Sequence, residues 1–207
     1  HPGFGGTEGL DEIDTMEDVV FHYLDVLDGL GLKRASLVGV SLGGWIAAEI
    51  AVRYPERIDR LVLADAFGLK LDGHAIPDVV ASIADPAALR PLVFADPKGP
   101  MADLLLPAKP SEEVRATLAR AAAAAARLGG TTGMHDPKLA RRLRRVTCPT
   151  LVVWGDRDPL LPLGYAEAYR DAIAGAELHV LENCGHLPHF EEEGRFVEAV
   201  REFCERR

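Results

Sequence analysis

The sequence feature that most limits the possible folds is a serine placed between glycines at the junction of two apolar stretches. Residues 38–45 read VGVSLGGW, with Gly39 two positions before Ser41 and Gly43 two positions after it. The apolar run 34–40 is typical of a short buried strand, and the residues after Ser41 are typical of a helix. The turn between them must be tight, and glycine removes a side chain that would collide with the neighbouring strand or helix. The pattern predicts a serine hydroxyl at the carboxyl end of a strand, where open parallel sheets keep their reactive groups; an ordinary glycine-rich turn is the alternative.

Short apolar runs alternate with helical segments over most of the chain. The expected strands are residues 34–40, 60–66, 148–156 and 176–186, and the expected helices are a segment that is capped by Thr15 and ends at Gly29, and residues 42–54, 164–173 and 194–204. Strands that alternate with helices imply right-handed crossovers and a parallel sheet. A chain of 207 residues is long enough for one sizeable core and short for two. We therefore expect a single α/β domain in which helices flank a mostly parallel sheet.

One long stretch, residues 67–146, breaks this alternation. It is punctuated by prolines and contains no convincing strand pattern. Asp85 and Asp136, each followed by proline, and Ser111 are candidate helix caps. An all-helical insertion between two strands of a parallel sheet predicts a lid over the strand ends. The expected division is a core of residues 1–66 and 147–207 with a helical lid of residues 67–146.

Composition and charge limit the function classes. The net charge is −9 at pH 7, so binding to nucleic acid or to an anionic membrane would need a local basic patch. The basic cluster 138–145 has helical spacing and is interpreted as a solvated face. Cys148, Cys184 and Cys204 have neither a disulfide framework nor metal-ligand spacing, which favours reduced thiols in the cytoplasm. No apolar run has the length of a membrane span, and no phosphate-binding glycine loop is present. We expect a small-molecule substrate, no nucleic acid, no membrane, no cofactor and no metal.

A nucleophilic serine needs a base that takes its proton and a third group that orients the base. Asp156 and Asp158 follow the third apolar run, and His186 and His189 follow the fourth. In a parallel sheet these loops belong at the same edge as Ser41. The sequence thus offers a serine, an acid and a histidine that could meet at the carboxyl ends of the strands.

Four motifs in order resemble the α/β-hydrolase superfamily. PGFGGTE resembles the loop after the fourth strand of that family, GVSLGG its nucleophile elbow, PTLVVWGDRD its acid loop and CGHLPHFEE its histidine loop. The chain is most similar to lid-bearing serine hydrolases, which include carbon–carbon bond hydrolases of the meta-cleavage type and lipase-like esterases. The resemblance implies Ser41 as nucleophile, Asp158 as acid and His186 as base. It also implies that the backbone N–H of Leu42 holds the oxyanion, and that Gly39 and Gly43 are the elbow glycines.

Each role has alternatives. Asp156 is interpreted as a surface turn residue, and Asp65 follows the second expected strand, where some members of the family carry the acid. A serine at position 41 argues against dehalogenases and epoxide hydrolases, which carry aspartate there. Five other histidines are interpreted as surface or packing residues: His22, His74, His135, His179 and His189.

The resemblance also implies that the chain is N-terminally truncated. The second oxyanion donor of the family comes from a loop after its third strand, which would precede all visible motifs. We expect the strand before Ser41 to have an unpaired edge. We also expect weak activity, because one missing oxyanion donor costs about a hundredfold to a thousandfold in rate.

The function expected from these observations is acyl transfer through Ser41 to water, on an ester or a related carbonyl compound, including the C–C bond of a vinylogous diketone. The alternative is a ligand-binding or catalytically weak α/β-hydrolase-like protein. The stretch expected to form the lid carries apolar residues that suggest an apolar substrate portion, or that pack the lid on the core: Val79, Val80, Leu89, Leu92, Val93 and Phe94.

Overall fold

The computed structural model describes residues 1–130 and 133–206, so two residues of the expected insertion and the last residue of the chain lie outside the described residues. The described part contains a four-stranded sheet in the order β1-β2-β3-β4. Its strands are β1 (Ala35–Val40), β2 (Ile58–Ala64), β3 (Thr150–Gly155) and β4 (Glu177–Leu181). Each neighbouring pair is parallel, which confirms the expected sheet type.

Helices connect all of these strands. They are α1 (Met16–Gly29), α2 (Leu42–Arg53), α3 (Val79–Ser82), α4 (Pro86–Val93), α5 (Pro100–Leu105), α6 (Glu112–Ala125), α7 (Leu139–Arg142), α8 (Gly164–Ala172), α9 (Pro188–Glu191) and α10 (Glu193–Glu205). Short turns of other helix types, η1 (Leu10–Glu12), η2 (Pro55–Arg57), η3 (Ala126–Gly130) and η4 (Leu143–Arg145), lie between them. No helix of the described residues is both long enough and apolar enough to span a bilayer.

Three of the expected helix caps are present. Thr15 and Asp18 form a capping box at the start of α1. The Asp85 side chain accepts a hydrogen bond from the N–H of Ala87, and Ser111 caps α6. The expectation at Asp136 was wrong: its Oδ1 accepts from Lys138 N–H in a turn, and α7 begins only at Leu139.

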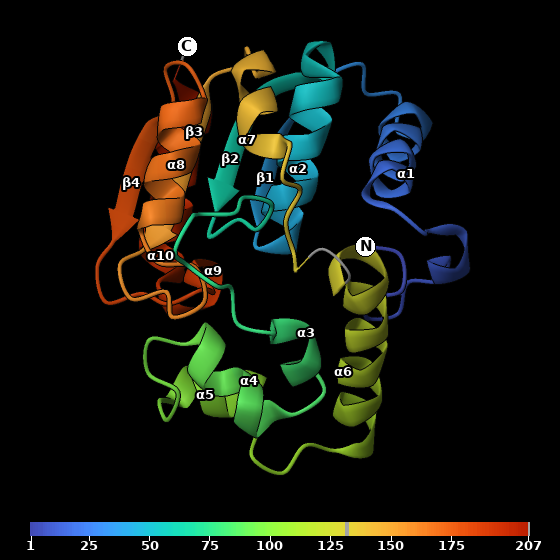
Figure 1. Ribbon diagram of the computed structural model, residues 1–207, viewed down its shortest axis with the longest axis vertical. Coiled ribbons are helices and arrows are strands. Elements are labelled where there is room, and N and C mark those ends of the chain that lie inside the picture. The colour runs from blue at the N-terminus through green and yellow to red at the C-terminus, as the bar shows by residue number, and fades with distance from the viewer. Residues whose placement is uncertain (131–132, 207) are drawn as a thin grey trace.

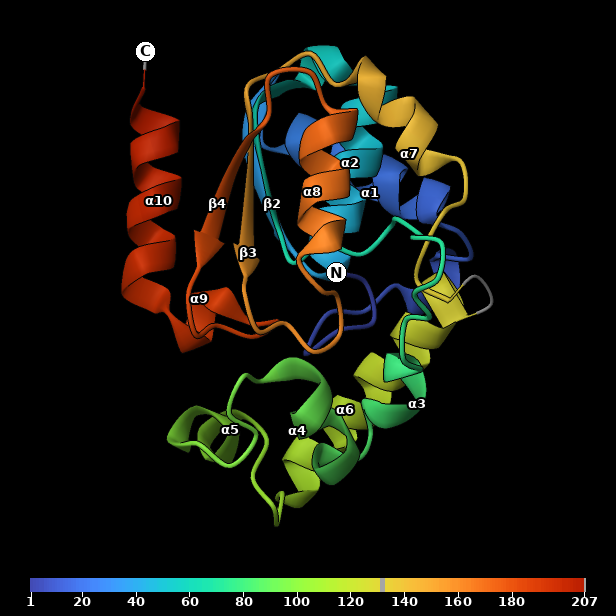
Figure 2. The same cartoon turned by 60° about the vertical axis from the view of Figure 1, so that its left-hand side comes forward.

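The sheet lies between two helical layers, as Figure 2 shows. α10 covers one face, where Phe196 and Phe203 pack against apolar side chains of β2 and β3. α2 and α8 cover the other face, and α1 packs beside α2. α2 is apolar around most of its circumference and almost entirely buried, so it forms the centre of the larger core. Its one buried charge, Glu49, is neutralised by Arg53 and bonded by Trp45 Nε1.

The segment between β2 and β3 holds α3 to α7. In Figure 1, α3, α4, α5 and α6 lie beyond the carboxyl ends of the strands. α7 instead lies beside the core and contacts α8. The apolar residues noted in this segment join the main core cluster, with Val79, Leu89, Val93 and Phe94 at most 9% exposed. They therefore pack the segment onto the core.

β1 is an edge strand of the described sheet. It pairs with β2 from Ala35 to Val40 and with no other described strand. The side chain of Val38, in the middle of β1, is 47% exposed. The unpaired edge that the sequence predicted is present in this part of the chain.

Candidate active site

Ser41 lies in the turn between β1 and α2, in a strained backbone conformation. Its φ of 56° and ψ of −119° lie in a region that L-residues rarely adopt. The turn is tied to the end of β2, because Ser41 N–H donates to the Ala64 carbonyl at 2.9 Å and Phe67 N–H donates to the Ser41 carbonyl at 3.1 Å. These hydrogen bonds keep Ser41 in its strained conformation, which costs about 1–3 kcal/mol at such positions.

The glycines around Ser41 do not all have the same role. A Cβ on Gly39 would lie 2.3 Å from the Gly43 carbonyl oxygen, so the strand and helix can approach only without it. A Cβ on Gly44 would lie 2.4 Å from the Cβ of Ala66. A Cβ on Gly43 would meet only the His1 ring, at 3.7 Å, which is ordinary contact. The steric expectation was right for Gly39 and wrong for Gly43, because Gly44 is the helix position that faces the chain after β2.

Asp158 lies in the loop that follows β3, with its carboxylate buried. Its Oδ1 accepts hydrogen bonds from the N–H groups of Leu160 at 2.8 Å and Leu161 at 3.0 Å. The Leu161 carbonyl in turn accepts a 2.8 Å bond from Trp154 Nε1. The loop thus wraps its own backbone around the carboxylate and leaves Oδ2 free to face the neighbouring loop.

His186 joins Asp158 to Ser41. Its Nδ1 lies 2.8 Å from Asp158 Oδ2, and its Nε2 lies 2.8 Å from Ser41 Oγ. The imidazole is 2% exposed and contacts the Phe67 ring, with centroids 5.5 Å apart. With Asp158 ionised, Nδ1 carries the proton and Nε2 is the acceptor for the serine hydroxyl. This arrangement can remove a proton from Ser41 and stabilise the imidazolium that results.

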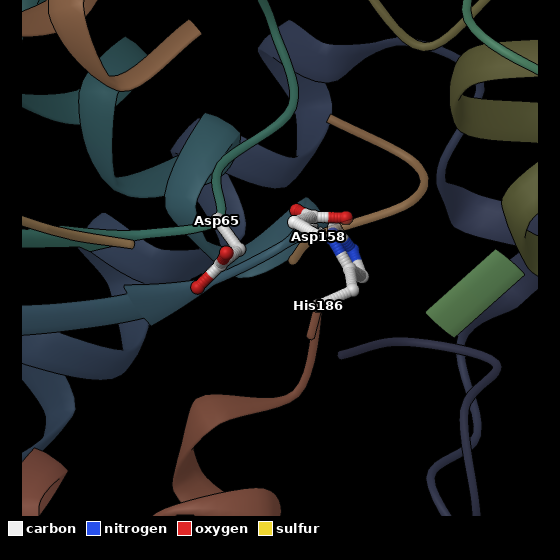
Figure 3. A group of neighbouring side chains, drawn as sticks. All are labelled: Asp65, Asp158 and His186. Atoms are coloured by element: carbon white, nitrogen blue, oxygen red, sulfur yellow. Dashed lines mark hydrogen bonds and ion pairs between the residues drawn. The ribbon is translucent and has the colours of Figure 1, made fainter. Parts of the chain in front are cut away.

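The other candidate acids lie in different surroundings. Asp156 is exposed, and its Oδ1 accepts a 3.3 Å bond from Cys184 N–H, as a turn residue would. Asp65 is fully buried and belongs to the same cluster as the histidine: Asp65, Asp158 and His186 offer atoms within 4.8 Å of one another (Figure 3). Three such side chains could in principle bind a cation. However, His186 Nδ1 and Asp158 Oδ2 are bonded to each other, and both Asp158 oxygens have donors.

The remaining site residues are an amide and the other histidines. Leu42 is the first residue of α2, so its N–H is one of the four amide donors with no acceptor inside the helix. The His189 ring contacts the tilted ring of Phe190, with centroids 4.2 Å apart. Burial, and to a lesser extent the nearby His186, lowers the pKa of His189. The other five histidines form none of the described contacts to Ser41, Asp158 or His186: His1 bonds the Tyr23 hydroxyl, His22 and His74 pack on tyrosine rings, His135 bonds the Gly133 carbonyl and His179 is exposed on β4.

The chain matches a known family over most of its length. Residues 1–199 match the model of a family described as the alpha/beta hydrolase family. The match spans most of the chain, so the chain belongs to the α/β hydrolase family, and its class is that of the α/β-hydrolase-type enzymes. The resemblance found in the sequence is confirmed.

Several relatives and structural neighbours are named as hydrolases or esterases. The 2-hydroxymuconate semialdehyde hydrolase of Pseudomonas sp. (strain CF600) is 34% identical over 209 residues, covering 97% of this chain and 73% of that protein. Among solved structures, a mutant meta-cleavage product hydrolase is 25% identical with a TM-score of 0.73, covering 97% of this chain and 76% of that one. A thermophilic esterase from Thermogutta terrifontis is 25% identical with a TM-score of 0.76, covering 98% and 76%.

Sequence reasoning missed two residues of the site. Asp65 was considered only as a competing acid, although an aspartate that directly follows a buried strand signals a place at the sheet edge. Glu191 was not considered at all. Its carboxylate accepts bonds from Ala95 N–H at 2.8 Å and Leu187 N–H at 3.3 Å, and no local sequence pattern announces such a bridge.

Proposed function

We propose that this chain is a serine hydrolase in which Ser41 is the nucleophile, His186 the general base and Asp158 the orienting acid. The observation that carries the proposal is the continuous hydrogen-bonded chain from Ser41 Oγ through both ring nitrogens of His186 to Asp158 Oδ2, with 2.8 Å at each link. A free serine hydroxyl is a poor nucleophile at neutral pH. These hydrogen bonds place the His186 imidazole where it can act as the base for Ser41.

The first half-reaction forms an acyl-enzyme. Ser41 Oγ attacks the carbonyl carbon of the substrate while His186 Nε2 takes the hydroxyl proton. The tetrahedral oxyanion is held by the Leu42 N–H at the start of α2, where the helix dipole also favours negative charge. As the carbonyl re-forms, the bond to the leaving oxygen or carbon breaks and His186 returns the proton to that leaving group.

The second half-reaction releases the acid. Water attacks the ester carbonyl and gives a proton to His186 Nε2, and the collapse of the second tetrahedral adduct returns that proton to Ser41 Oγ. The products are a carboxylic acid and either an alcohol or a C–H compound. Asp158 stays ionised throughout, because two backbone N–H groups and the imidazole all bond to its carboxylate form.

The substrate that we propose is a carbonyl compound. The relative from Pseudomonas is named a 2-hydroxymuconate semialdehyde hydrolase and a solved neighbour a meta-cleavage product hydrolase, which supports hydrolysis of a C–C bond beside a carbonyl. The esterase neighbour supports carboxylic esters as the second substrate class. We propose residues 67–146 as the lid that covers this site, and a cytoplasmic location in keeping with the free thiols of Cys148, Cys184 and Cys204.

A fluorophosphonate probe followed by mass spectrometry tests the nucleophile directly. We expect an adduct on Ser41 in the wild type and none in Ser41→Ala, with Ser36→Ala on β1 as a matched control that still labels. Turnover of 2-hydroxymuconate semialdehyde and of short-chain p-nitrophenyl esters then separates the two substrate classes. Binding of either compound without turnover and without labelling would support the ligand-binding alternative and contradict the proposal.

A further inference from the structure

Asp65 is a buried carboxyl group that the proposed reaction does not use. It follows β2 directly, its φ is 43°, and its side chain is inaccessible to solvent. Its Oδ1 accepts a hydrogen bond from Gly155 N–H at 3.0 Å. Its Oδ2 is equally buried but receives a hydrogen bond from no described residue. Buried oxygens without a donor are rare, so the position and protonation state of this side chain need a physical explanation.

The neighbour of Asp65 is the carboxylate of Asp158. Figure 3 shows Asp158 between Asp65 and His186, and the three groups offer atoms within 4.8 Å of one another. Two buried carboxyl groups this close cannot both be ionised without a large electrostatic cost, so one of them holds a proton.

The hydrogen bonds decide which group keeps the charge. Asp158 accepts from two backbone N–H groups and from His186, whereas Asp65 accepts from one N–H. Hydrogen bonds donated to a carboxylate favour its ionised form, which places the charge on Asp158 and the proton on Asp65. Burial, and then the charge of Asp158, raises the pKa of Asp65 well above its ordinary value.

Two further titratable groups face Asp65, and neither opposes this assignment. Glu191, from α9, is an acid whose charge raises the pKa of Asp65 further. Cys184, from the histidine loop, has a thiol whose pKa is raised mainly by burial, so it stays neutral and adds no charge. The surroundings of Asp65 therefore favour the uncharged acid.

We propose that Asp65 is a neutral carboxylic acid whose Oδ2 hydroxyl donates a hydrogen bond to the carboxylate of Asp158. This bond fixes the orientation of Asp158 and disperses part of its charge, without adding a second negative charge beside His186. Asp65 is then a positioning residue that acts on the base through the acid. Its catalytic consequence rests on the proposed function, but the location of its proton does not.

Two substitutions at position 65 distinguish a hydrogen bond donated by residue 65 to Asp158 from a negative charge on residue 65. Asp65→Asn stays neutral and keeps both an oxygen for Gly155 N–H and an N–H donor for Asp158. Asp65→Leu has a similar size and can neither donate nor accept. Asp156→Asn, in the exposed part of the neighbouring loop, is the matched control.

Infrared spectroscopy observes the proton without any turnover. We expect the wild type and Asp156→Asn to show the carbonyl stretch of a protonated aspartic acid at neutral pH, and Asp65→Asn to lack it. NMR titration of the His186 imidazole provides the second readout. We expect the same titration in the wild type and Asp65→Asn, and a raised His186 pKa in Asp65→Leu, because the charge of Asp158 is then less dispersed.

Kinetics provide the third readout. We expect kcat of Asp65→Leu to fall roughly tenfold to a hundredfold, with KM little changed, because a hydrogen bond to a charged group is lost. We expect Asp65→Asn to retain most of kcat. A His186 pKa that falls in Asp65→Asn would mean that Asp65 is ionised and would overturn the inference. Identical titrations of the His186 imidazole in all variants would mean that Asp65 only packs against its neighbours. If Asp65→Leu does not fold, the infrared band and Asp65→Asn still decide.

These readouts distinguish the two proposals. A protonated-carboxyl band in a protein without turnover would overturn the proposed function and leave the inference standing. Turnover without the band would overturn the inference and leave the proposed function standing.

Discussion

The backbone N–H of His186 donates a hydrogen bond to the carbonyl of Val93, 2.9 Å away, so the end of α4 is bonded directly to the residue beside Ser41. Glu191 strengthens this link. One of its oxygens accepts from Ala95 N–H, just after α4, and the other from Leu187 N–H in the histidine loop. The helical insertion and the histidine loop therefore form one hydrogen-bonded unit.

Removal of the Glu191 carboxylate should loosen this unit. Glu191→Ala leaves two backbone N–H groups without their acceptor, so we expect the free energy of unfolding to fall by about 1–3 kcal/mol. Glu191→Gln keeps one acceptor oxygen and should lose less. Urea denaturation measures both, with the exposed Glu202→Ala on α10 as the control. Equal stability of Glu191→Ala and this control would show that the bridge does not stabilise the fold.

The strain at Ser41 predicts an unusual order of stabilities. Ser41→Ala and Ser41→Gly both remove the hydroxyl, but only glycine adopts a φ of 56° without steric cost. We therefore expect the free energy of unfolding of Ser41→Gly to be about 1 kcal/mol higher than that of Ser41→Ala. Thermal and urea unfolding of the two variants side by side provide the measurement. An alanine variant as stable as the glycine variant would mean that the turn relaxes in solution.

The elbow glycines should differ in their tolerance of a methyl group. Gly39→Ala forces a Cβ to 2.3 Å from the Gly43 carbonyl, so we expect about 3 kcal/mol of destabilisation or a failure to fold. Gly43→Ala meets only a ring at 3.7 Å and replaces glycine in a helix, which favours folding by about 0.5–1 kcal/mol. Expression level and urea midpoints compare them, and equal losses at both positions would contradict the geometry.

The buried Asp65 predicts a pH dependence of stability. Because its folded-state pKa lies above the ordinary value of 3.8, the folded protein keeps this proton over a pH range in which the unfolded chain has lost it. The free energy of unfolding of the wild type therefore falls with rising pH in that range, by about 1.4 kcal/mol per pH unit, relative to Asp65→Asn.

Urea denaturation of the wild type and Asp65→Asn between about pH 5 and pH 8 measures this difference. We expect the stability of Asp65→Asn relative to the wild type to rise with pH until the pKa of folded Asp65 is passed. Asp156→Asn should show no such trend, because its side chain is exposed. A flat difference for Asp65→Asn would mean that Asp65 ionises at its ordinary pKa.

Much of the fold follows from local sequence patterns. Thr15, Asp85 and Ser111 cap helices as expected, because a cap depends on bonds to N–H groups only two or three residues away. The alternation of strands and helices predicted the parallel sheet. The expected bounds of the strands differ from the observed ones by a few residues, since strand ends depend on the partner strand.

The site was harder to predict where it depends on contacts between distant residues. Loop order and resemblance suggested Ser41, Asp158 and His186, and the structure brings their side chains within hydrogen-bond distance; their roles stay predictions. Spacing alone suggested that Gly43 avoids a collision, whereas the rotation of α2 points Gly44 at Ala66 instead. That Asp65 lies beside Asp158 depends on how β2 and β3 align, which no local pattern specifies.

The bond between Ser41 and His186 joins residues 145 positions apart, and β4, which precedes the histidine, is the last strand of the described sheet. During synthesis Ser41 emerges long before the imidazole that is proposed to activate it. Contacts of such long range form late, after the intervening strands have docked. On the proposed mechanism, nucleophilic reactivity arises only once the histidine loop after β4 has been made, and a chain interrupted before β4 would carry a serine without its base.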